Sequence, residues 1–262
     1  MKDYCEKSIR SLQLAGMSER TQESYTRAVR MVADFYRKTP DQIEEPELES
    51  YFLHRRNQDK WSAATLRIAY SGIKFFFINV LKRDWHIFTY LKAKRKRKLP
   101  CILSKEEVFR ILNRITTFHN YVFLSTVYAC GLRISEALGL QVSDIDGKRM
   151  LIHVHRGKGA KDRYVPLPEE TYHLLRRYWP THKNPVFIFP ALGRGSNKGP
   201  TAQVPMAIDS VQGAFRKAKA TAGITKRRVS VHTLRHYAEY RTMPSYHISP
   251  FNASDLSMIN SA

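Results

Sequence analysis

Five side chains in the C-terminal part of the sequence are of the types that bind a phosphate group, move protons at it or orient a group that does. They are Arg133, Glu136, Lys158, His232 and Arg235. An arginine can hold two phosphate oxygens at once, and a lysine or histidine can donate a proton to a leaving oxygen. Glu136 follows Arg133 by three residues, so we expect it to orient Arg133 from the same helical face. The set predicts charge stabilisation and acid–base assistance at a phosphodiester.

Three motifs carry these residues, and each alone has a plain structural interpretation. GLRISEALGL (131–140) could hold a surface ion pair, GKGAKDRYVPL (157–167) an ordinary basic turn, and HTLRH (232–236) an isolated helical turn. The glycines beside Lys158 let a backbone approach a phosphate closely, although the segment lacks the P-loop pattern. No carboxylate pair for a metal ion accompanies the motifs. We therefore predict a phosphate site without metal or cofactor, which needs a side-chain nucleophile for covalent chemistry.

The elements that must position these residues form a mainly helical domain with a small antiparallel sheet. Ser104 and Glu107 form a capping box before one helix, and Gly131 ends another, predicted over 121–129. Residues 150–155 and 163–167 have the pattern of two strands, and the glycine-bearing turn between them predicts a β-hairpin. Further helices are predicted over 135–140, 168–179 and 209–222, and Ser230 is suited to cap the helix of HTLRH.

Residues 1–91 predict a separate domain of four helices. Ser18 and Ser62 are suited to cap two of the helices, and Pro46 suits the first turn of a third. Ile9 and Leu12 supply apolar residues to the first helix.

Residues 92–100, KAKRKRKLP, separate the two domains. A block of like charges resists compact folding, so the segment is predicted to be a linker. A solvated segment is the plain interpretation, but the charge of the whole chain favours a strap along a phosphate backbone. The residues predicted to bind DNA in this way are Lys92, Lys94, Arg95, Lys96, Arg97 and Lys98.

The composition narrows the class of partner. The 262 residues carry a formal net charge of +21, which favours a polyanion, with duplex DNA, RNA and an anionic membrane surface as the alternatives. Cys5, Cys101 and Cys130 show neither paired nor metal-ligand spacing, which fits a reducing cytosol. The N-terminus has no apolar signal segment, and FFFINVL (75–81) is too short to span a bilayer. We expect a soluble protein of the bacterial cytosol or nucleoid.

The three motifs, in this order and at these separations, resemble those of tyrosine recombinases of the phage-integrase and Xer kind, especially integron-type integrases. The resemblance covers roughly residues 1–236. It implies a SAM-like, helical core-binding domain over 1–91 and an α+β catalytic domain over 101–236, which together clamp duplex DNA. It also implies self-association on DNA in the full-length form.

The resemblance implies a role for each matched residue. Arg133 and Arg235 correspond to the two phosphate-binding arginines, and Glu136 to a supporting acidic residue. Lys158 corresponds to the hairpin lysine that protonates the leaving 5′ oxygen, and His232 to the histidine of the His-x-x-Arg motif. In the family a tyrosine attacks the scissile phosphate and forms a 3′-phosphotyrosine bond, which needs neither ATP nor a metal ion.

The resemblance stops after His236. The family continues with a Leu-Gly-His motif and a tyrosine roughly 35 residues beyond the histidine of His-x-x-Arg, a count that passes Ala262. Tyr237, Tyr240 and Tyr246 lie much closer to His232, so no nucleophile is assigned. We interpret 237–262 as an atypical tail after an incomplete catalytic domain. A frameshift or truncation after codon 236 is the simplest origin, and a divergent natural C-terminus is the alternative.

Three functions follow as hypotheses. The first is a recombinase by descent that binds DNA but neither cleaves nor rejoins it. The second is a DNA-binding accessory that occupies recombination sites, or an inert remnant of an integrase. The third is an unrelated basic RNA-binding protein, for which the order of the three motifs would be a coincidence.

Overall fold

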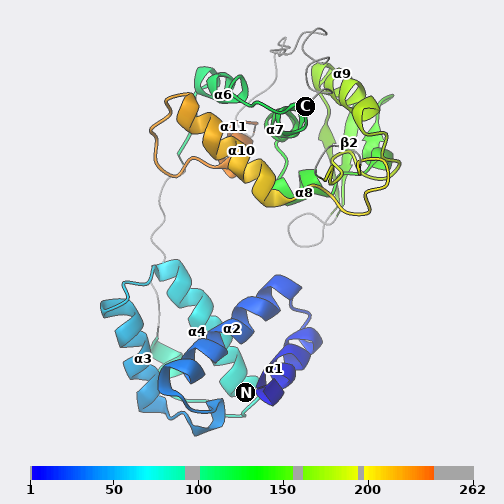
Figure 1. Cartoon of the computed structure of the whole chain (residues 1–262). Helices are drawn as coiled ribbons and strands as arrows, with labels where there is room; N and C mark the ends of the chain where they lie inside the picture. The colour runs from blue at the N-terminus through cyan, green and yellow to red at the C-terminus, as the bar shows by residue number, and fades with distance from the viewer. Residues whose placement is uncertain (1, 92–100, 156–161, 194–197, 239–262) are drawn as a thin grey trace. The chain divides into compact units, whose positions relative to one another are not determined.

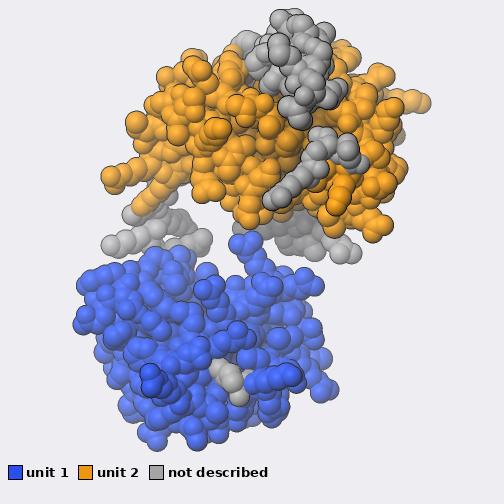
Figure 2. Space-filling model, viewed as in Figure 1, with its two compact units in different colours: residues 1–98 blue, residues 99–262 orange. Residues whose placement is uncertain are grey.

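The computed structural model describes residues 2–91, 101–155, 162–193 and 198–238. The chain divides into two compact units, residues 1–98 and 99–262 (Figure 2). The predicted linker at 92–100 and residues 239–262 of the predicted tail at 237–262 lie outside the described residues.

Unit 1 contains the four predicted helices (Figure 1): α1 (Lys2–Leu14), α2 (Glu19–Tyr36), α3 (Glu45–Asn57) and α4 (Ala63–Asn79). Two short helices, η1 (Pro40–Gln42) and α5 (Ile87–Tyr90), were not predicted. The Ser62 hydroxyl accepts a hydrogen bond from the backbone N–H of Thr65 at 3.1 Å, as its predicted role as a cap requires. Ser18 also lies at an N-cap position, but its hydroxyl pairs with the hydroxyl of Thr21 at 2.9 Å.

The core of unit 1 lies between α2, α3 and α4. Its largest fully buried side chains include Tyr51, Ile73, Phe76 and Phe77. The predicted first helix is α1, in which Leu12 is buried and Ile9 is 37% exposed. Ser8 takes the inward position instead, four residues before Leu12 and therefore on the same helical face.

Unit 2 is built around α7 (Phe118–Cys130), which is buried on nearly all sides and packs against α6, α9, α10 and α11 (Figure 1). Because a helix surrounded in this way needs apolar residues on every face, its sequence lacks a polar stripe. It begins three residues before the predicted start at Tyr121 and ends at Gly131, whose φ of 62° is the left-handed conformation that glycine adopts readily. The surrounding helices are α6 (Lys105–Leu112), α8 (Ile134–Leu138), α9 (Glu169–Tyr178), η3 (Trp179–Thr181), α10 (Ile208–Thr221) and α11 (Val231–Ala238).

The sheet of unit 2 has three antiparallel strands in the order β1 (Ile145–Asp146), β2 (Leu151–Val154) and β3 (Arg163–Pro166), and β1 follows the short helix η2 (Val142–Asp144). The predicted hairpin of β2 and β3 is confirmed, and Val154 pairs with Arg163 at its described end. Ile152 and Val154 are buried, so the side chain of His153, which lies between them, is on the outer face of the sheet. Strand β1 was not predicted. The turn that carries Lys158 lies outside the described residues.

The observed fold class is the predicted one, a mainly helical chain with a small antiparallel sheet. Within the described ranges, no helix combines the length and the apolar character that crossing a membrane requires.

Candidate phosphate-binding site

Glu136 is the centre of a cluster of arginines in unit 2. Its side chain is only 4% exposed, and it is the third residue of α8. Its carboxylate accepts a hydrogen bond from the backbone N–H of Arg133 at 2.8 Å and pairs with the Arg133 guanidinium at 2.5 Å. The spacing of three residues therefore brings the two together as predicted, although Arg133 occupies the N-cap position and is not itself helical.

A second arginine, Arg163, holds the same carboxylate from the first position of β3. Its two terminal nitrogens donate to the two oxygens of Glu136, each at 2.8 Å. This is the bidentate geometry that only arginine offers a carboxylate. Arg163 was not among the residues predicted from the sequence, because its partner lies 27 residues away and the pairing depends on the position of β3.

The third arginine, Arg235, comes from α11, which packs against α7. Its Nη1 lies 3.9 Å from Glu136 Oε2, and its side chain is 15% exposed. The fold thus brings Arg133 and Arg235 to one carboxylate from positions far apart in the sequence. His232 precedes Arg235 by one helical turn and is exposed.

The ionisation of Glu136 follows from these contacts. Burial opposes the charged form, but the hydrogen bonds from Arg163 and from the backbone and side chain of Arg133 outweigh it and lower the pKa of Glu136 to about 2. The same contact raises the pKa of Arg163. Three guanidinium groups against one carboxylate leave a formal charge of +2 at the cluster. Such a cluster can attract a phosphate diester.

Both parts of the chain match models of known protein families. Residues 5–87 match the model of the phage integrase N-terminal SAM-like domain, and residues 101–243 match the model of the phage integrase family. The chain belongs to the phage integrase family. The class of activity of these tyrosine recombinases is site-specific DNA recombination, as the resemblance implied.

Individual relatives agree with the family match. A Sinorhizobium fredii protein described as an integrase/recombinase is 36% identical over 226 residues, which cover 86% of this chain and 70% of the relative. Tyrosine recombinase XerD of Oceanobacillus iheyensis is 32% identical over 179 residues, covering 62% of this chain and 59% of the relative. The solved structure of a lambda integrase dimer bound to a core site matches the fold with a TM-score of 0.70 at 15% identity, covering 91% of this chain and 84% of that chain.

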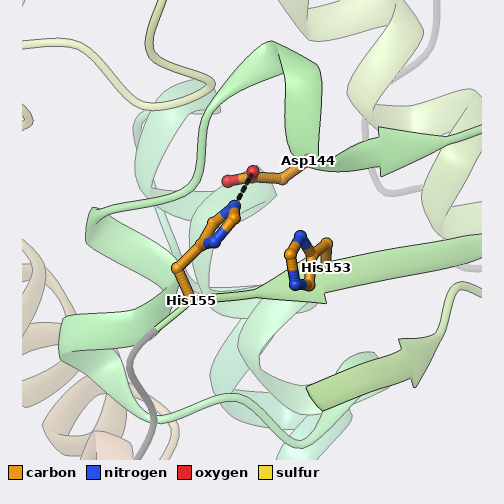
Figure 3. Close-up of side chains that lie close together, drawn as sticks. All are labelled: Asp144, His153 and His155. Atoms are coloured by element: carbon orange, nitrogen blue, oxygen red, sulfur yellow. Dashed lines mark hydrogen bonds and ion pairs between the residues drawn. The ribbon is translucent and has the colours of Figure 1, made fainter. Parts of the chain in front are cut away.

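A second cluster of polar side chains in this integrase-family chain combines Asp144, a buried residue of η2, with two histidines at the outer face of the sheet. Asp144, His153 and His155 each bring a potential metal-ligand atom within 4.8 Å of the others (Figure 3). No metal site was predicted from the sequence, because the cysteines are not paired and no pair of carboxylates accompanies the motifs. The signal available in the sequence was the alternation of His153 and His155, which places both side chains on one face of a strand.

Proposed function

We propose that this chain binds duplex DNA and holds one phosphate of the backbone at the cluster formed by Arg133, Arg163 and Arg235. The observation that supports the proposal is the shared, buried carboxylate of Glu136, which hydrogen-bonds the guanidinium groups of Arg133 and Arg163 and lies 3.9 Å from that of Arg235. Donors that are already fixed lose little entropy when a ligand arrives, so the site is prepared to bind a phosphate.

Within this proposal Arg133 and Arg235 are the phosphate-binding pair, and Arg163 holds Glu136 in place. His232, on the same helix as Arg235, assists acid–base chemistry or binds the phosphate. Lys158 and the basic segment 92–100 lie outside the described residues, and we propose the roles that the sequence predicts for them, proton donation and contact with the DNA backbone. Self-association on DNA belongs to the same proposal.

We further propose that this chain binds DNA without forming a covalent bond to it. Residues 237–262 contain no Leu-Gly-His motif, and Tyr237, Tyr240 and Tyr246 do not have the family's spacing from His232. Without a tyrosine in position, the arginines can stabilise charge on a phosphate but cannot start strand cleavage.

Binding is tested by the salt dependence of affinity for a labelled duplex. In the Arg133→Ala/Arg235→Ala double variant we expect a weaker affinity and a slope of log K against log salt that is smaller by about 1, because one phosphate contact is lost. Arg149→Ala is the control, since Arg149 is exposed on the surface of unit 2. If the double variant binds with the affinity and slope of the control, the cluster is not a phosphate site.

Cleavage is tested with a nicked suicide duplex, which traps a covalent protein–DNA adduct on a denaturing gel. We expect no adduct. An adduct that disappears in Tyr240→Phe or Tyr246→Phe would show that the tail supplies the nucleophile.

The same assays separate the alternatives. Nanomolar binding to one sequence without an adduct indicates an accessory that occupies recombination sites. Weak binding to any duplex, with a steep dependence on salt, indicates an inert remnant. Preference for structured RNA over duplex DNA in competition would favour the RNA-binding hypothesis.

A further inference from the structure

The outer face of the β2–β3 hairpin gathers three groups that can bind a metal ion. Continuing the register that pairs Val154 with Arg163 places His155 opposite Asp162, and His153 lies opposite Tyr164. Because alternate residues of a strand point to the same side, His153, His155 and Asp162 share this outer face. Arg163 points to the opposite side, toward Glu136, so the hairpin separates this group from the phosphate site.

Two of the distances between these groups are close to those in a tetrahedral metal site. Asp162 Oδ2 lies 3.5 Å from His153 Nε2 and 3.6 Å from His155 Nδ1. For zinc–ligand bonds of about 2.0–2.1 Å, two ligands of a tetrahedral site lie roughly 3.3–3.5 Å apart. The two contacts therefore have almost the length of the edges of such a site, and both exceed a hydrogen bond.

Asp144 contacts the second ring nitrogen of His155, Nε2. Its Oδ1 lies 2.8 Å from His155 Nε2, a hydrogen-bond distance that is too short for two ligands of one ion (Figure 3). Its Oδ2 accepts the backbone N–H of Gln141 at 2.8 Å, which holds the buried carboxylate in place. Metal-binding histidines characteristically donate their second ring N–H to such a carboxylate, which leaves Nδ1 of His155 as the ligand atom.

We propose that His153 Nε2, His155 Nδ1 and Asp162 Oδ2 bind one divalent transition-metal ion of the zinc class, with Asp144 orienting His155 and water as the fourth ligand. Two imidazoles and one carboxylate favour zinc and its first-row neighbours over magnesium or calcium, which prefer oxygen ligands alone. The bound ion links residue 155 to residue 162 and so fastens the two ends of the segment that carries Lys158. This inference stands apart from the proposed function, because none of its residues belongs to the phosphate cluster.

The full chain, treated with a chelator and dialysed, tests the proposal in a calorimetric titration with Zn²⁺ alone. We expect a stoichiometry of one ion per chain. His153→Ala and His155→Ala should each weaken binding at least tenfold, whereas His173→Ala should leave it unchanged, since that exposed histidine pairs with Glu169 on α9. Titration with Co²⁺ should give the visible absorption of a tetrahedral ion in the unaltered chain and not in the two variants.

Two further variants separate direct from indirect roles. Asp162→Asn should weaken zinc binding as the histidine variants do, whereas Asp144→Asn, which keeps the shape of the side chain, should weaken it by about 10–100-fold without changing the stoichiometry. Circular dichroism of each variant checks that the chain is folded. Absence of zinc binding in the unaltered chain, or equal affinity in the His153→Ala, His155→Ala and His173→Ala variants, would overturn the proposal. DNA binding by the metal-free chain is a separate readout, so failure here leaves the phosphate site untouched.

Discussion

Glu136 is a buried carboxylate whose negative charge is stabilised by two hydrogen-bonded arginines, Arg163 and Arg133. A carboxylate with so little exposure is normally costly to ionise, and here the hydrogen bonds from Arg163 and Arg133 reverse that cost. The same contacts hold the guanidinium groups in place before any phosphate arrives. Glu136 is therefore a positioning residue, which acts on a bound phosphate through the arginines.

Glu136→Gln should lower stability at neutral pH and alter its dependence on pH. The folded-state pKa of about 2 lies below the ordinary value of 4.5, so the charged group contributes stability above about pH 4.5 and loses it as the pH falls toward 2. A depression of this size corresponds to roughly 3 kcal/mol in full. We expect the difference in unfolding free energy between the unaltered chain and the variant to shrink by roughly 2 kcal/mol between about pH 6 and pH 3 in urea titrations.

The exposed carboxylate of Glu169 supplies the control for this measurement, since its side chain is 80% exposed. Glu169→Gln should leave the pH profile of the unaltered chain within about 0.5 kcal/mol. A Glu136→Gln variant whose profile runs parallel to that of the unaltered chain would show that Glu136 titrates alike in the folded and unfolded states.

Some contacts of Glu136 can be predicted from the sequence, and others cannot. A spacing of three residues predicted the contact of Glu136 with Arg133, because helix geometry converts that spacing into proximity. Arg163 and Arg235 reach the same carboxylate through β3 and α11, and no local spacing encodes those approaches. The family motif predicted Arg235 as a site residue but not its position beside Glu136. Arg163 was found only in the structure.

At the scale of elements, Gly72 permits the close packing of α4 against α2. A Cβ atom at this position would lie 2.7 Å from the Cα of Tyr25, and backbone cannot give way as a flexible side chain does. Gly72→Ala should therefore destabilise unit 1 by roughly 1–2 kcal/mol, the cost of overpacking less the helix propensity gained. Thermal unfolding followed by circular dichroism measures the shift.

Gly213 is the matched control, because it also lies within a helix, α10, and a Cβ there would meet no atom within 4 Å. Gly213→Ala should stabilise the chain by about 0.5–1 kcal/mol, since alanine favours the helix and restricts the unfolded chain. If both substitutions shift the transition in the same direction, helix propensity and not the approach of α2 and α4 dominates at Gly72.

Asn184 organises the irregular segment between α9 and α10. It is 1% exposed, accepts the backbone N–H groups of Val186 and Phe187, and donates to the carbonyls of Gly199 and Ala202. Asn184→Ala leaves these buried groups without their partner, which should lower the unfolding free energy by about 3 kcal/mol in urea.

Asn79→Ala is the control for Asn184, because Asn79 is exposed and donates a hydrogen bond to the carbonyl of Phe75 in its own helix. It should change stability by less than about 0.5 kcal/mol. Equal effects of the two substitutions would mean that solvent satisfies the backbone groups around Asn184.

Local signals predicted most helices and failed for the shortest elements. The capping box of Ser104 and Glu107 and the cap of Ser62 placed the starts of α6 and α4, because capping is a contact within one turn. Strand β1 has two residues and no alternation of its own, so only its pairing with β2 defines it. Residue type alone does not determine which side of α1 faces inward, because Ser8 is buried and Ile9 is 37% exposed.

At the scale of the whole molecule, the described residues form two separate hydrophobic cores, one in each unit. The change of sequence pattern on either side of the basic segment predicted this division, because each side has apolar residues at its own helical spacing. The direction in which α11 packs on α7, and with it the position of Arg235, depends on the folded core of unit 2 and is not encoded by any local pattern.

The charge of +21 belongs to the whole chain and should govern its encounter with nucleic acid. If about six phosphates are neutralised on binding, log K should fall with log salt at a slope of about −5, because each contact releases a condensed counterion. Fluorescence anisotropy of a labelled duplex between about 50 and 200 mM salt measures this slope. Glu169→Gln, which removes one exposed negative charge on α9, should leave it nearly unchanged. A slope near zero would contradict binding through phosphates, and with it the polyanionic partner that the net charge of the chain predicts.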